Sequence, residues 1–144
     1  MKLNTASDVH VFNQDFFQWF KENKTSKYDA VLANPPYIRH QYLSSAQKEI
    51  QTEILTNNNL KSNRLINSWV AFVIASINLL KNEGKIALVI PSDILQVSYA
   101  KDLRSFLIKE LSELNLITFK GIVFPDTEQN WELRGCKKQN LNTL

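Results

Sequence analysis

Short, almost wholly apolar runs alternate along this chain with longer segments in which apolar and polar residues are mixed. The runs 28–33 and 85–90 are apolar at nearly every position, as in strands that are buried on both faces of a sheet. Weaker strand patterns occur at 9–12 and 114–119. The pattern therefore predicts a sheet built from these segments.

The segments between the strands have the spacing and start signals of helices. Ser44 and Gln47 are placed as in a capping box, where each side chain bonds to the backbone of the other residue. Asn67 and Ser68 can cap a long apolar helix for which Gly84 is the stop. The expected helical segments are 16–20, 44–55, 69–80 and 99–111.

Strands and helices alternate, and this order predicts an α/β domain with a mainly parallel sheet. The 144 residues, of which 44% are hydrophobic, suffice for one domain with a core of its own. From residue 130 the sequence becomes polar and unpatterned, so a strand at 131–133 would be weak at most. We therefore expect a domain over residues 1–129 and a divergent polar tail over residues 130–144.

Charge and cysteine content narrow the class of protein only slightly. A net charge of +3 and a pI near 9.0 are compatible with a nucleic-acid partner. The single cysteine, Cys136, excludes an internal disulfide and a zinc knuckle, and His10 and His40 lack the spacing of metal ligands, so no metal site is expected. The chain opens on polar residues, and its longest apolar stretch is too short to span a bilayer. These features predict a cytoplasmic protein with no membrane partner.

The candidate chemistry lies in the tetrapeptide Asn34-Pro35-Pro36-Tyr37, which directly follows the run 28–33. Each proline fixes its own φ and favours extended geometry in the residue before it. The side-chain oxygen of Asn34 and the backbone oxygen of Pro35 are thereby held as two hydrogen-bond acceptors. The carboxyl end of a strand is also where an open α/β sheet places its binding site.

Two such acceptors suit an exocyclic aromatic amine, such as N6 of adenine. Hydrogen bonds from both N–H groups favour a more tetrahedral nitrogen and localise its lone pair for attack on a methyl group. The Tyr37 ring could stack on the base for about 1–3 kcal/mol, provided that the base is flipped out of its duplex. A simpler interpretation, a Pro-Pro turn that caps a strand beside a core tyrosine, stays open on these residues alone.

Several collinear segments extend the pattern beyond the tetrapeptide. Together they resemble the γ-group N6-adenine DNA methyltransferases of bacterial restriction–modification systems, over residue 15 to about residue 129. The strand with its tetrapeptide is the most specific part. The matching segments are 13–17, 28–39, 84–92, 99–107 and 122–125.

The resemblance implies roles in binding the target base. Asn34 and Pro35 would accept the hydrogen bonds of the target amine, and Tyr37 would act with them as the ring that stacks on the base. Pro36 and Phe124 would also contact the flipped adenine, although Phe124 could instead be a core residue.

The resemblance also implies S-adenosylmethionine as the methyl donor. Asp15 would bind the adenine moiety of the donor, with Phe16 beside it. The alternative is that Asp15 merely caps the helical turn at Phe16. Direct transfer from the sulfonium to nitrogen would need no covalent intermediate and no metal.

Two parts of the family pattern are missing. The Gly-rich loop that binds the donor has no counterpart, because the only glycines are Gly84, Gly121 and Gly135 and too few residues precede Asp15 for a strand–loop–helix–strand unit. A target-recognition domain is also absent. We therefore expect a partial Rossmann-like methyltransferase domain that lacks its first strands and exposes 28–33 as an open edge. The implied partners are double-stranded DNA with a flipped adenine and a complementary chain carrying the donor-binding motif, and the isolated chain is expected to be inactive.

Two other functions stay open. Protein-glutamine methyltransferases also carry Asn-Pro-Pro-Tyr, because a carboxamide nitrogen poses the same chemical problem. The chain could otherwise be a non-catalytic assembly subunit of a split methyltransferase, which uses its open edge to bind another protein.

Overall fold

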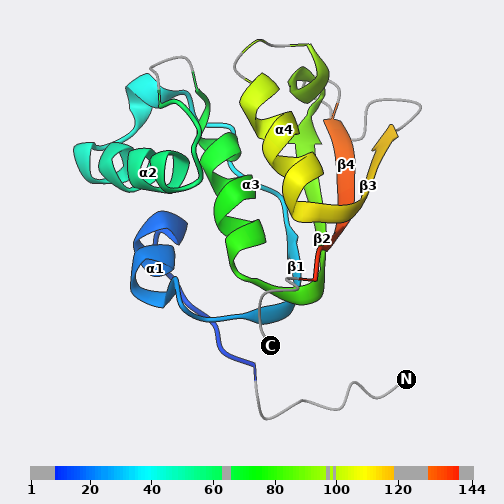
Figure 1. The fold of residues 1–144 in the computed structure, drawn as a ribbon. Coiled ribbons are helices and arrows are strands. Elements are labelled where there is room, and N and C mark those ends of the chain that lie inside the picture. The colour runs from blue at the N-terminus through cyan, green and yellow to red at the C-terminus, as the bar shows by residue number, and fades with distance from the viewer. Residues whose placement is uncertain (1–8, 63–65, 97, 99, 119–129, 140–144) are drawn as a thin grey trace, which may run out of the picture.

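A computed structural model describes residues 9–62, 66–96, 98, 100–118 and 130–139 (Figure 1). In chain order the elements are α1 (Phe16–Asn23), β1 (Tyr28–Ala33), η1 (His40–Tyr42), α2 (Ser45–Asn57), α3 (Ser68–Asn78), β2 (Leu80–Pro91), η2 (Ser92–Leu95), α4 (Ala100–Glu110), β3 (Leu111–Thr118) and β4 (Asn130–Lys137). α3 and α4 lie against one side of a four-stranded sheet, and α1 and α2 lie beyond α3.

The strands are arranged in the order β1-β2-β4-β3. β1 is parallel to β2, whereas β4 is antiparallel to both of its neighbours. Three strands therefore run in one direction and β4 runs in the other, which confirms the α/β class. The core lies between this sheet and α3, whose residues 68–77 are all buried.

The helices occupy the predicted segments, and α2 begins as its sequence predicts. Ser44 Oγ accepts a hydrogen bond from Gln47 N at 3.2 Å, and Gln47 Oε1 accepts one from Ser44 N at 3.0 Å, so the capping box forms. None of the helices in the described ranges has the length and apolar character needed to cross a membrane.

The strand 28–33 is less buried than its composition predicts. Within the described residues β1 pairs only with β2, and Leu32 is 85% exposed. Val31 and Ala33 pack against the core, whereas Leu32 faces the side of the sheet opposite the helices. The prediction of burial on both faces is wrong, because helices cover only one face of β1, and even there Val31 and Ala33 are only partly buried. The prediction of an open edge is confirmed for the described part of the chain.

Residues 130–137 form a strand, although their composition predicts a polar tail. β4 lies between β2 and β3, and Leu133 at its centre is completely buried opposite Leu88 and Leu116. Glu132 and Arg134 alternate with it, and their side chains form an ion pair at 2.7 Å. β4 is held by the burial of Leu133 and by pairing with β2 and β3. The face of β4 opposite Leu133 tolerates polar residues because no described helix covers it. The expectation of a polar tail is therefore corrected for these residues.

The strand predicted at 9–12 is absent. These residues have no regular structure and are exposed, and Val11 is 87% exposed. An isolated apolar run forms a strand only where a neighbouring strand can pair with it, and no described strand lies beside this one.

Gly84 lies inside β2 and not at the end of the preceding helix, where the sequence predicts it. α3 ends at Asn78, and the chain passes almost directly into β2. A Cβ atom on residue 84 would lie 2.9 Å from the Lys81 carbonyl oxygen and 3.2 Å from that of Tyr28. Glycine is therefore required by the close approach of two carbonyls, one within β2 itself and one in β1, beside the register shift of the β1–β2 ladder.

We expect the Gly84→Ala variant to lose about 1–3 kcal/mol of unfolding free energy, because the added methyl group must push carbonyl oxygens apart. Urea unfolding followed by circular dichroism measures the change. Lys85→Ala, at the exposed neighbouring position, is the control and should change the unfolding free energy by less than about 0.5 kcal/mol. An equal loss in both variants would contradict the steric role of Gly84.

Candidate active site

The tetrapeptide lies at the carboxyl end of β1, as the sequence predicts. Pro35 is buried, Asn34 and Pro36 are exposed, and Tyr37 is half-buried. The ladder pairs Ala33, the last residue of β1, with Leu88 of the parallel strand β2. The Asn34 side chain is therefore presented to solvent beside two strands that run in the same direction.

Tyr37 ties the tetrapeptide to β2. Its hydroxyl donates a hydrogen bond to the Val89 carbonyl oxygen at 3.1 Å and lies 3.5 Å from Asn34 Oδ1. The ring packs against the core, and burial raises the pKa of Tyr37 to about 12. The phenol thus stays neutral at ordinary pH and anchors the turn, and its stacking on a base stays a prediction.

The raised pKa gives the Tyr37 hydroxyl a distinct pH signature. Its contribution to stability is complete below the ordinary tyrosine pKa of 10.0 and is lost as the pH rises towards 12, because the unfolded chain ionises first. Ultraviolet titration at the tyrosinate band should show a phenol that ionises near pH 12 and is missing from Tyr37→Phe. If the Tyr37→Phe variant instead loses a phenol that ionises near pH 10, this result contradicts the burial of the Tyr37 hydroxyl.

The two expected acceptors, Asn34 Oδ1 and the Pro35 carbonyl oxygen, receive no strong hydrogen bond from any described residue. Asn34 Oδ1 has only the long contact with Tyr37, at 3.5 Å, and no described donor reaches the Pro35 carbonyl oxygen. A hydrogen bond of this length contributes little. Both oxygens therefore keep acceptor capacity for an incoming N–H group.

Ser68 holds the other end of the tetrapeptide, and sequence reasoning missed this role. Its hydroxyl donates to the Pro36 carbonyl oxygen at 2.7 Å and accepts from Ile38 N at 3.0 Å. The residue is completely buried at the start of α3, and Ser68 N also donates to the Ile38 carbonyl oxygen at 3.0 Å. Asn67 takes the cap position without a side-chain cap bond, so this Asn-Ser pair does not cap the helix as expected. A serine at the first position of a mostly apolar helix is the signal that could have found it.

Asp15 caps α1 and joins its start to that of α2. Its Oδ1 accepts hydrogen bonds from Phe17 N and Gln18 N, both at 3.0 Å, and its Oδ2 accepts one from Gln47 Nε2 at 2.8 Å. Gln47 belongs to the capping box of α2, so one carboxylate links two helix starts. The capping interpretation thus describes what this side chain does here, and its role towards a methyl donor stays a prediction.

The remaining predicted residues are less informative about the site. Phe16 stacks on Phe72, with ring centroids 3.9 Å apart, and therefore contributes to packing between α1 and α3. Phe124 lies outside the described residues. The structure thus brings Asn34, Pro35 and Tyr37 together, and it leaves Asp15 and Phe16 on a separate helix.

The described arrangement can orient an amine and accept its hydrogen bonds. None of the tetrapeptide side chains is a nucleophile or base near neutral pH, so these residues offer no route to a covalent intermediate. Among the described residues, no group of three or more His, Cys, Asp or Glu side chains is placed to hold a metal ion.

Comparison with known proteins extends this description. Residues 2–124 match the family of Eco57I restriction-modification methylases. The type II methyltransferase M.AccI of Acinetobacter calcoaceticus is 32% identical over 137 residues, which are 93% of this chain and 24% of that protein. The type II methyltransferase M.HincII of Haemophilus influenzae is 35% identical over 115 residues, which are 78% of this chain and 22% of that protein.

A solved structure shares the fold. The methyltransferase subunit of a type I restriction-modification system from Streptococcus thermophilus superimposes with a TM-score of 0.59 at 22% identity, over 81% of this chain and 25% of that chain. The chain spans about a quarter of the length of the relatives that it matches.

Proposed function

The chain belongs to the Eco57I restriction-modification methylase family, and we propose that it forms the catalytic pocket of an adenine-N6 DNA methyltransferase that uses S-adenosylmethionine. The observation that carries the proposal is the placement of two acceptor oxygens, on Asn34 and Pro35, at the carboxyl end of β1. Tyr37 and Ser68 hold the turn on either side through hydrogen bonds of 3.1 and 2.7 Å.

In this proposal the flipped adenine places its N6 amine between Asn34 Oδ1 and the Pro35 carbonyl oxygen. The nitrogen lone pair attacks the methyl carbon of the sulfonium. The N–C bond forms as the S–C bond breaks with its electron pair left on sulfur, and the nitrogen then releases a proton to solvent. The two acceptors stabilise the positive charge that develops on nitrogen, and Tyr37 stacks on the base with Pro36 and Phe124 beside it.

We also propose that Asp15 and Phe16 lie next to the methyl donor. A carboxylate oxygen has two lone pairs, and Asp15 Oδ2 has one described donor, Gln47 Nε2. It can therefore accept a further hydrogen bond, from the donor's adenine, without releasing the helix cap.

The open edge of β1 is the proposed junction with polypeptide that carries a donor-binding loop. Leu32 is 85% exposed there, and a hollow of about 640 Å³ beside it is lined by apolar residues, such as Ala87 and Ile117, and by charged residues, such as Lys85 and Arg134. Backbone groups along an unpaired edge are a template for a further strand.

Reconstitution tests the proposal. The chain is mixed with the part of M.AccI that it does not match, and tritiated S-adenosylmethionine is added with duplex DNA or with a release factor. We expect label in DNA, recovered as N6-methyladenine. Label confined to the release factor, or recovered as N4-methylcytosine, would overturn the adenine assignment. Calorimetric titration of the chain alone should show no micromolar affinity for the donor.

The exposed edge also favours a second function, that of a non-catalytic assembly subunit. Co-elution of the two polypeptides, with full methyl transfer by a complex that carries Asn34→Ala, would favour this function over the catalytic one.

A further inference from the structure

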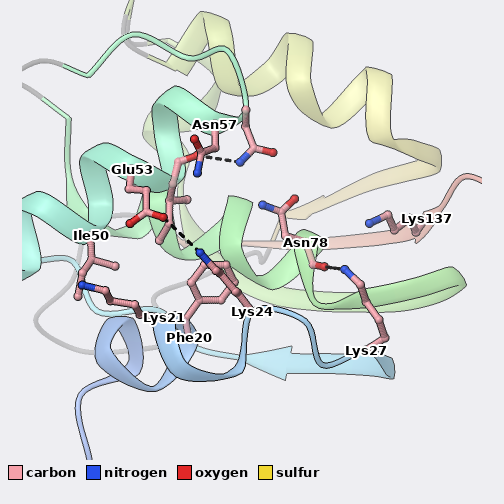
Figure 2. A pocket seen from close by; sticks show the side chains of 11 residues that line it. Phe20, Lys21, Lys24, Lys27, Ile50, Glu53, Asn57, Asn78 and Lys137 are labelled. Atoms are coloured by element: carbon pink, nitrogen blue, oxygen red, sulfur yellow. Dashed lines mark hydrogen bonds and ion pairs between the residues drawn. The ribbon is translucent and has the colours of Figure 1, made fainter.

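A pocket of about 290 Å³ lies at the end of the molecule opposite the tetrapeptide. It forms where α1, α2 and α3 end, next to the start of β1 (Figure 2). Four lysines line it, namely Lys21, Lys24, Lys27 and Lys137. The proposed methyl transfer uses none of these residues.

Two of the lysines are held at the end of α3. Lys27 Nζ donates to the Asn78 carbonyl oxygen, and Lys137 Nζ donates to that of Ile77 at 3.0 Å. These carbonyls belong to the last turn of the helix, where cations are favoured. These two hydrogen bonds give Lys27 and Lys137 a structural role at the end of α3. They do not involve Lys21 or Lys24.

The pocket has a surplus of positive charge. Among the described residues that line it, only Glu53 is acidic, and it lies 3.5 Å from Lys24, so four lysines against one glutamate leave a formal charge of +3. The three helix ends supply roughly half a negative charge each, which offsets only about half of that surplus. Burial, and after it the nearby charge of Lys27, lower the pKa of Lys137, and the carboxylate of Glu110 opposes them in part.

The pocket also has apolar and amide lining residues. The lining residues Phe20, Ile50 and Ile54 belong to the core, and the amides of Asn57 and Asn78 also line the pocket. Apolar side chains beside basic ones suit a ligand with a negatively charged group attached to a less polar one.

We propose that this pocket binds a phosphate-bearing ligand, with the phosphate next to Lys21 and Lys24 at the end of α1. Phosphate carries enough charge to neutralise the surplus, and its oxygens can accept several ammonium hydrogen bonds at once. The same chemistry occurs in a small phosphorylated molecule and in the backbone of DNA, and the test separates these two sources.

Calorimetric titration of the full chain with inorganic pyrophosphate, and separately with a short DNA duplex, is the test. We expect saturable binding of at least one probe that weakens as salt is raised. The variant Lys21→Ala/Lys24→Ala should weaken it at least tenfold. The control Lys61→Ala/Lys101→Ala removes the same charge from exposed positions outside the pocket and should change it less than twofold. Absence of saturable binding, or an equal loss in both variants, would overturn the proposal.

The two probes identify the source of the phosphate. Binding of pyrophosphate alone supports a small ligand, and binding of DNA alone supports a backbone contact. Heteronuclear NMR of the Lys21 and Lys24 ammonium groups adds an independent measurement, since a bound phosphate should shift their resonances. Resonances that do not respond to the saturating probe would count against the site. Neither measurement requires methyl transfer, so failure of the proposed catalytic function leaves this result interpretable.

Discussion

Replacing Asn34 by alanine is expected to lower methyl transfer by the reconstituted enzyme about 100- to 1,000-fold, the range found when one preorganised hydrogen-bonding group is removed from a charge-stabilising site. The Asn34 side chain is exposed and makes only the long contact with Tyr37, so its loss should leave the fold unchanged. Single-turnover measurement with tritiated donor gives the rate of the chemical step. Circular dichroism and urea unfolding verify that the variant is folded.

Asn115→Ala is the matched control for this experiment. Asn115 is also an exposed asparagine, in strand β3, and its side chain bonds only to Glu113, at 3.0 Å, among the described residues. Its replacement should change the rate less than twofold. A rate for Asn34→Ala that equals the rate for Asn115→Ala would remove the role of the amide oxygen in catalysis.

Replacing Ser68 by alanine should have the largest effect on the position of the tetrapeptide. The Pro36 carbonyl and the Ile38 amide each lose their hydrogen bond to the Ser68 hydroxyl, at roughly 1–2 kcal/mol for each group, so we expect a loss of about 2–4 kcal/mol in unfolding free energy. The turn then loses its support from α3. Misplacement of a reacting group by about 1 Å can lower a rate about 100-fold, so kcat should fall more than the KM for DNA rises.

The same helix supplies a control for this substitution. Ser76 is also completely buried in α3, and its hydroxyl has no hydrogen-bond partner within the described residues. Ser76→Ala should therefore be neutral or slightly stabilising, because it removes a buried polar group that lacks a partner. Ser68→Thr keeps the hydroxyl and should recover most of the lost kcat. Equal stability of Ser68→Ala and Ser76→Ala would contradict the support described here.

Local signals allowed much of the fold to be predicted. The capping box at Ser44 and Gln47 acts within one helix start, and the apolar run that became β1 is bounded by the prolines. β4 could not be predicted in the same way, because Leu133 is held by strands more than ten residues away in sequence. Gly84 was assigned to a helix end for a similar reason, since one of the two close approaches that require it, that of the carbonyl in β1, is not local.

The residues of the site divide in the same way, into those placed by the local sequence and those placed only by packing between distant segments. Asn34, Pro35 and Tyr37 are consecutive or nearly so, and the conformational limits of proline bring them together without help from distant residues. Ser68 lies 30 residues beyond Ile38 in sequence, and only the docking of α3 brings its hydroxyl to the turn. The contact between Asp15 and Gln47, which are 32 residues apart, likewise depends on how two helices pack.

The place of β4 in the strand order has a consequence for synthesis of the protein on the ribosome. β4 is the latest of the described strands to be translated, yet it fills the position between β2 and β3. Until its residues leave the exit tunnel, β2 and β3 of the nascent chain each have an edge whose backbone groups lack the hydrogen-bond partners that β4 later supplies. These edges can pair prematurely with another nascent chain. We expect ribosome-bound chains halted before residue 130 to recruit holding chaperones, and those extended well past residue 137 to release them.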